Sequence, residues 1–73
     1  MRSDASAPVD WYARRDELMP DMVFIDRQGD RVMLDQRVEG DGSKWEVADW
    51  NVDHWSYDGG TIEPGDLVER IEA

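Results

Sequence analysis

The sequence predicts a single, mainly β domain: a small antiparallel barrel or roll, with a short helix near the N-terminus. Short apolar segments alternate with charged residues at the period of a strand, and glycine-containing turn signals separate them. A chain of 73 residues has room for only one small core. Residues 1–8, rich in Ser, Ala and Asp and ending at a proline, predict a flexible tail. Residues 9–73 then form the domain.

The segment from Asp10 to Met19 predicts the N-terminal helix. Asp10 is a typical N-cap residue. Trp11 and Leu18 lie seven positions apart and would share one face of the helix, which Pro20 would end.

A first hairpin is predicted from strands at 22–26 and 31–39, joined at Gln28-Gly29. The favoured register matches both charges and apolar residues. Its pairs are Arg27–Asp30, Asp26–Arg31, Ile25–Val32 and Val23–Leu34. A turn with Gly29 in the left-handed conformation would instead place Asp26 opposite Asp30, and like-charge repulsion disfavours that arrangement.

A second hairpin is predicted from strand 31–39, the loop at 40–43 and a strand at 44–50. Its expected pairs are Glu39–Lys44, Val38–Trp45, Arg37–Glu46 and Gln36–Val47. That register would leave Asp49 on the core side, so we predict a bulge at Ala48-Asp49 that exchanges it with Trp50. Trp45 and Trp50 would then face the core, and Trp55 would lie beyond a turn at 51–53.

The C-terminal third predicts a strand at 55–58, a turn at Gly59-Gly60, a strand around Ile62 and a turn at Pro64-Gly65. The segment 66–72 is open between two structures. Asp66 and Glu69 would form a capping box for a helix, whereas Leu67 and Ile71 also alternate as in a strand.

This succession of short strands, with a proline-containing single turn before the last segment, resembles an SH3-like barrel. The resemblance covers residues 21–72 at the level of pattern and identifies no family. It implies a strongly bent antiparallel sheet.

The formal net charge is −10, and it is unevenly distributed. Residues 1–37 contain six basic and eight acidic side chains, whereas residues 38–73 contain two basic and ten acidic ones. Such a field repels nucleic acid and anionic membranes and attracts basic proteins. Without cysteine, a signal peptide or a long apolar segment, the sequence predicts a soluble cytoplasmic protein. A surface that is acidic only for solubility is the alternative interpretation.

His54 is the only histidine, and it lies near three aspartates in the sequence. A metal site, in a small metal-assisted enzyme or an enzyme subunit built around His54, is therefore one hypothesis. Scattered aspartates are common in so acidic a chain, so a solvated loop histidine is favoured. No cofactor motif or nucleophile motif is present, and we expect neither a cofactor nor an enzyme activity.

The large aromatic side chains exceed what so small a core needs. Exposed tryptophan and tyrosine beside acidic groups favour cationic or proline-rich peptides. We therefore expect a non-enzymatic interaction module that binds a basic protein surface through residues 49–58. The candidate binding residues are Trp50, Trp55, Tyr57, Asp49, Asp53 and Asp58. The alternatives are a nucleic-acid mimic or small inhibitor of mobile-element origin, and a domain that self-associates through the same rings.

Overall fold

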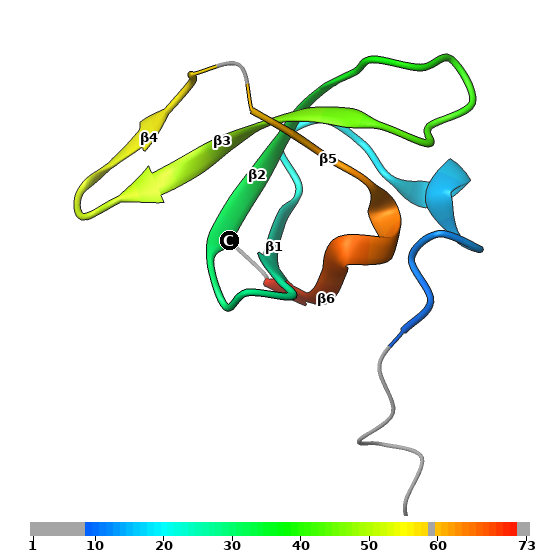
Figure 1. The fold of residues 1–73 in the computed structure, drawn as a ribbon, viewed down its shortest axis with the longest axis horizontal. Helices are drawn as coiled ribbons and strands as arrows, with labels where there is room; N and C mark the ends of the chain where they lie inside the picture. Colours follow the sequence, from blue (N-terminus) through cyan, green and yellow to red (C-terminus); the bar gives the residue numbers. More distant parts are fainter. Residues whose placement is uncertain (1–8, 59, 72–73) are drawn as a thin grey trace, which may run out of the picture.

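The computed structural model describes residues 9–58 and 60–71, so the tail predicted at 1–8 lies outside the described residues. Within these residues, six strands form one antiparallel sheet (Figure 1). They are β1 (Val23–Asp26), β2 (Arg31–Arg37), β3 (Trp45–Asn51), β4 (His54–Ser56), β5 (Thr61–Ile62) and β6 (Leu67–Ile71). Two single turns of 3-10 helix, η2 (Arg15–Glu17) and η3 (Pro64–Asp66), precede β1 and β6 respectively.

The strands follow the order β4-β3-β2-β1-β6, and β5 pairs with β3 on the same side as β4. Figure 1 shows β6 beside β1 and the β3–β4 hairpin extending away from the rest of the molecule. The prediction of a mainly β, antiparallel fold is confirmed. The sheet is not closed into a barrel, because β6 pairs with β1 alone among the described strands. Among residues 9–58 and 60–71, no helix is both long enough and apolar enough to cross a membrane.

The core lies on one side of the sheet and is covered by the N-terminal segment. Trp45 and Phe24 are its largest fully buried side chains, and Trp11 meets Phe24 edge to face at 5.0 Å. Met22 and Ile62 pack against its margin. The cluster consists of Trp11, Leu18, Phe24, Val32, Leu34, Trp45, Val47 and Leu67. The predicted burial of Trp45 is confirmed.

The helix predicted from Asp10 to Met19 is wrong: the segment forms an irregular turn followed by η2. Asp10 does cap the turn, because its Oδ1 accepts a hydrogen bond from the backbone N–H of Ala13 (3.1 Å). The carbonyl of Tyr12, however, accepts from the Arg15 backbone N–H and from the Arg15 guanidinium. A segment this short gains little from α-helical hydrogen bonds alone, so tertiary contacts decide its conformation.

The predicted register of the first hairpin is wrong by one residue. Phe24 lies opposite Val32, and Ile25 lies opposite Arg31. The turn is the disfavoured one, with Gly29 at φ +87° and Asp26 opposite Asp30. Oδ1 of Asp26 accepts hydrogen bonds from the backbone N–H groups of Gln28 (3.0 Å) and Asp30 (2.8 Å). These two bonds offset the repulsion between the carboxylates.

The second hairpin also differs from its predicted register by one residue. The backbone N–H of Val38 donates to the carbonyl of Lys44 (2.9 Å), and Arg37 lies opposite Trp45. Gly42 accounts for the shift, because its φ of +78° closes a loop in which its N–H donates to the carbonyl of Glu39 (3.0 Å).

The predicted bulge at Ala48-Asp49 is wrong as well. The register shifts in β2 instead, between Leu34 and Gln36, and Leu34 then lies opposite Val47 in the core. This bulge keeps Trp45 and Val47 on the core side despite the changed register. Trp50 stays on the other side of the sheet, so its predicted move to the core does not occur.

The C-terminal third follows the prediction closely. The turn that joins β3 to β4 consists of Val52 and Asp53, within the predicted range 51–53, and Trp55 lies beyond it in β4. The predicted turn at Gly59-Gly60 includes Gly59, which lies outside the described residues. The segment from Leu67 is a strand and not a helix, because it pairs with β1 from Asp26 to Val23.

Candidate protein-interaction face

The side of the sheet that faces away from the core is also largely apolar. Because side chains alternate along each strand, the burial of Phe24 places Val23 on the outer side. Val23 lies opposite both Ile71 and Met33, so these three side chains form a row across β6, β1 and β2. The same alternation places Trp50, next to the core-facing Asp49, on this outer side.

Trp50 and Trp55 are directly opposite each other in β3 and β4, and their rings meet edge to face. The ring centroids are 5.2 Å apart, with the planes inclined at 69°. Trp50 is 40% exposed and Trp55 is partly exposed, whereas Trp11 and Trp45 are buried. The guanidinium of Arg31 lies 5.8 Å from the Trp50 ring centroid, within range of a cation–π contact.

A shallow groove of about 560 Å³ runs over this outer side. We call its apolar lining the aromatic face: Val23, Met33, Trp50, Trp55 and Ile71. Asp21 and Arg31 complete the lining. The groove is therefore apolar, with charged residues among its lining side chains.

Asp49 faces the opposite side of the sheet from Trp50, opposite Val32 and Ser56. Burial raises the pKa of its carboxyl group above the usual value, and the nearby carboxylates of Asp58, Asp30 and Asp26 raise it further. The carboxylates of Asp26, Asp30 and Asp58 therefore lie within electrostatic range of Asp49, which is on the side of the sheet away from the aromatic face.

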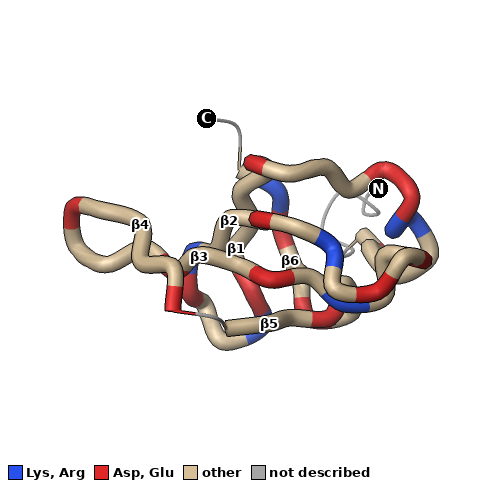
Figure 2. Tube along the Cα trace, turned by 90° about the horizontal axis from the view of Figure 1, so that it is seen from above, with Lys and Arg blue, Asp and Glu red and all other residues tan. Residues whose placement is uncertain are grey.

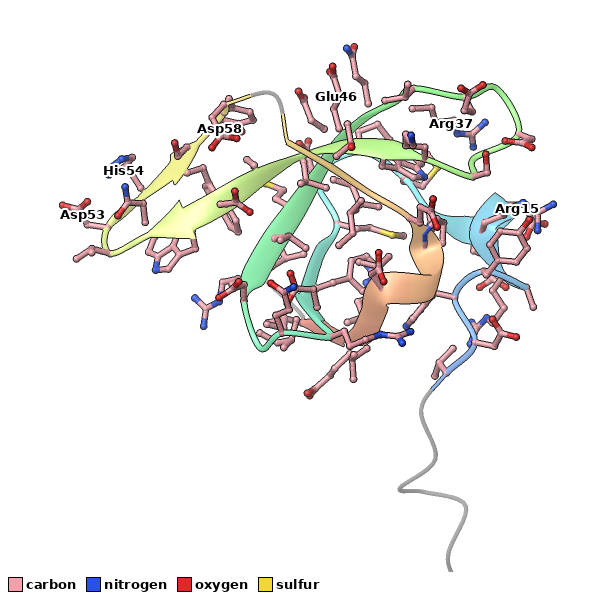
Figure 3. All side chains as sticks on the ribbon, in the orientation of Figure 1. Arg15, Arg37, Glu46, Asp53, His54 and Asp58 are labelled. Atoms are coloured by element: carbon pink, nitrogen blue, oxygen red, sulfur yellow. The ribbon has the colours of Figure 1, made fainter. Side chains whose placement is uncertain are left out.

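The tip of the β3–β4 hairpin carries Asp53 and His54, as Figure 3 shows. His54 Nδ1 and Asp53 Oδ1 are 2.8 Å apart, and both side chains are exposed. Asp58 lies beyond β4, where its Oδ1 accepts a hydrogen bond from the backbone N–H of Gly60 (3.2 Å). Tyr57 is 60% exposed. Over residues 9–58 and 60–71, no three His, Cys, Asp or Glu side chains are arranged to hold a metal ion.

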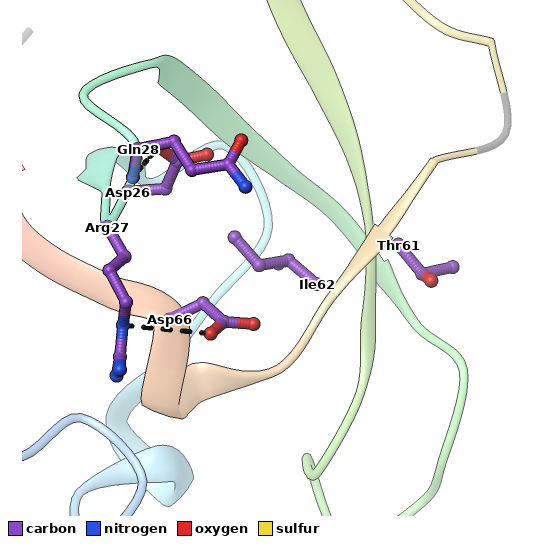
Figure 4. A pocket seen from close by; sticks show the side chains of 6 residues that line it. All are labelled: Asp26, Arg27, Gln28, Thr61, Ile62 and Asp66. Carbon is purple, nitrogen blue, oxygen red and sulfur yellow. Dashed lines mark hydrogen bonds and ion pairs between the residues drawn. The ribbon is translucent and has the colours of Figure 1, made fainter.

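A second, polar hollow of about 240 Å³ lies between the β1–β2 turn and η3 (Figure 4). Arg27 spans it, with its guanidinium donating to the carbonyl of Gly65 and lying 3.9 Å from the Asp66 carboxylate. The backbone N–H of Arg27 also donates to the carbonyl of Asp66 (2.8 Å). These contacts join the first hairpin to η3, which is a structural role.

The structure brings only part of the predicted site together. Trp50 and Trp55 share one surface, whereas Asp49 lies on the other side of the sheet and Asp53 at the hairpin tip. The sequence reasoning missed Val23, Met33 and Ile71, because the shifted register assigned Val23 to the core. The continuous apolar run at 22–25 was the available signal, since such a run is typical of a strand covered on both sides.

Comparison with models of known protein families gives no match for this chain. No curated protein and no solved structure matches it either.

Proposed function

We propose that this protein is a non-enzymatic interaction module that binds a basic, partly apolar segment of another protein through the aromatic face. The observation that carries the proposal is the Trp50–Trp55 pair, which stays partly exposed in a chain that buries its other two tryptophans. Tryptophan is enriched among the residues that dominate binding energy at protein interfaces. A peptide-binding module needs two adjacent exposed rings, whereas a nucleic-acid mimic does not need them.

The charge distribution supports a basic partner. Residues 45–58 contain four acidic side chains and neither lysine nor arginine, and Figure 2 shows acidic positions along the β3–β4 hairpin. The net charge of −10 would accelerate the encounter with a cationic segment, and added salt would slow it. Indole rings also attract lysine and arginine directly through cation–π contacts.

We read the architecture as SH3-like. The strand order β4-β3-β2-β1-β6, and the position of η3 directly before β6, support this reading. This architecture does not by itself indicate a function, because one small β architecture hosts many unrelated functions.

The nucleic-acid mimic is the second candidate, and the clustering of Asp26, Asp30, Asp49 and Asp58 favours it. A mimic would present these carboxylates to a protein groove that normally binds phosphates. It would need no exposed indole ring. The two candidates therefore differ in which side of the sheet they use.

Capture from the native lysate by the immobilised protein, at low and at high salt, separates them. The variants are Trp50→Ala, Asp30→Lys and, as the matched control, Tyr12→Ala, which removes another half-exposed ring outside the aromatic face. We expect a basic protein to be lost with Trp50→Ala and at high salt, and to be kept by Tyr12→Ala. If Asp30→Lys abolishes capture of the protein and Trp50→Ala does not, the proposal is contradicted and the nucleic-acid mimic is favoured.

A further inference from the structure

β4 is an edge strand. It ends the strand order of the sheet, and β3 is its only partner among the described strands. Figure 1 shows its outer side open, because β5 crosses β3 nearer the body of the molecule. An open edge offers unpaired backbone N–H and C=O groups to another chain.

The pairing within the hairpin identifies the open groups. Asn51 and His54 flank a loop of two residues, and such a pair exchanges both of its backbone hydrogen bonds. Pairs alternate in an antiparallel ladder, so Trp50 and Trp55 form the next, non-hydrogen-bonded pair. The backbone N–H and C=O of Trp55 therefore point away from β3, toward the open edge.

A strand added along this edge would meet two different surfaces. On one side its side chains would extend the row formed by Trp50 and Trp55. On the other side they would lie next to His54 and Ser56, where Asp49 and Asp58 supply negative charge. Because side chains alternate along a strand, one segment fits both surfaces when apolar and basic residues alternate in it.

We propose that the partner segment binds as an additional strand along β4, with apolar side chains on Trp55 and basic side chains toward Asp49 and Asp58. This inference rests on the proposed function and specifies its binding mode. A basic segment is preferred to a second copy of this chain, because two copies would bring two net charges of −10 together. The Trp55 backbone supplies only two hydrogen bonds, so the indole contacts and the charges must supply the remaining affinity.

Synthetic peptides test this mode. The parent peptide alternates valine and lysine over about eight residues, a usual strand length. One derivative carries N-methyl groups on the valine amides and the other carries the same number on the lysine amides. Amides of successive residues point to opposite edges of a strand, so all valine amides lie along one edge and all lysine amides along the other. Only one derivative therefore blocks the edge that meets β4. Affinity is measured by titration calorimetry against the wild type and Trp55→Ala, and amide exchange of Trp55 by NMR.

We expect the parent peptide to bind, with Trp55→Ala weakening it and the Trp55 amide exchanging more slowly in the complex. One derivative should lose affinity by about tenfold or more and the other should bind nearly as the parent does. Equal affinities of the two derivatives, or unchanged exchange at Trp55, would overturn strand addition while leaving the proposed function in place. Absence of parent binding would contradict both, and dimerisation through β4 in sedimentation without peptide would favour a second copy as the occupant.

Discussion

Val52 adopts a backbone conformation that a β-branched residue rarely takes. Its φ is +62°, in the left-handed region, and its side chain at the tip of the β3–β4 hairpin is 87% exposed. The tight turn requires such a conformation, because the backbone N–H of Asp53 donates to the carbonyl of Asn51 (2.6 Å) and closes a three-residue turn centred on Val52. Contacts of the side chain cannot compensate for the strain, since the side chain is almost fully in solvent.

Val52→Gly should therefore stabilise the protein. Strain at a left-handed non-glycine residue costs about 1–3 kcal/mol, and glycine loses part of that gain through its greater freedom in the unfolded chain. We expect a net gain of about 1 kcal/mol, or a rise in Tm of about 4–8 °C in thermal unfolding. Val68→Gly is the control, because Val68 is an exposed valine of β6 without positive φ, and this variant should be less stable than the wild type. A loss of stability with both variants would contradict the account of the turn.

Asp49 makes stability depend on pH in the direction opposite to that of most carboxylates. Its pKa is raised in the folded state, so the stabilisation associated with it is complete when the group is protonated in both states, below about pH 3.9. That stabilisation is lost as the pH rises through the folded-state pKa. At pH 7 the ionised, partly buried carboxylate destabilises the fold.

Asp49→Asn should consequently be more stable than the wild type at pH 7 in urea unfolding. The difference should shrink as the pH falls through the folded-state pKa and vanish below the unfolded-state pKa of about 3.9, where the group is protonated in both states. Asp16→Asn removes the same charge from an exposed position in η2 and serves as the control. If Asp49→Asn raises the stability equally at pH 7 and pH 3.5, or if Asp16→Asn raises it by the same amount, the charge of Asp49 is excluded as the cause.

At the scale of elements, strand positions were predictable and strand registers were not. Alternation located β1 to β4 to within about two residues, because the burial of one face dictates where polar and apolar residues fall. Register depends on turn geometry, and both hairpins turned on glycines with positive φ, Gly29 and Gly42. Pairing rules between side chains could not anticipate that Asp26 would bond the backbone of its own turn.

The wrong register of the first hairpin also limited how much of the aromatic face was predictable. Exposed tryptophan near residues 50–55 was expected from the number of rings. The apolar partners from β1, β2 and β6 required the correct register, since a shift of one residue exchanges the two faces of a strand. The N-terminal turn was not predictable as such, because the Arg15 guanidinium joins the nearby carbonyl of Tyr12 to the distant carbonyl of Asp41.

The β1–β2 turn can be tested through Asp26. Asp26→Ala removes the acceptor of two backbone hydrogen bonds and should destabilise the protein by about 1–2 kcal/mol in chemical unfolding. Asp26→Asn keeps an oxygen acceptor and removes a charge near Asp49, so it should equal or exceed the wild type in stability. Equal destabilisation by both variants would show that the charge, and not the hydrogen bonds, fixes this turn.

On the scale of the whole molecule, the two sides of the sheet carry different properties. One side buries the core and carries Asp49, and the other presents the aromatic face. Charge on a small domain mainly determines the rate at which partners associate, whereas rings that become buried in the interface mainly determine the rate of dissociation.

Asp58→Lys should accordingly slow the association of a basic partner and reduce the salt dependence of the association rate, with less effect on dissociation, in surface plasmon resonance.

The aromatic face is tested most directly by the four indole N–H signals in a ¹H–¹⁵N NMR titration with the valine–lysine peptide. Trp50 and Trp55 lie on the aromatic face, whereas Trp11 and Trp45 are buried in the core, so the four signals report on the two sides of the sheet separately. We expect the signals of Trp50 and Trp55 to move as peptide is added and those of Trp11 and Trp45 to stay in place. Binding that leaves the Trp50 and Trp55 signals unmoved would show that the peptide does not bind at the aromatic face.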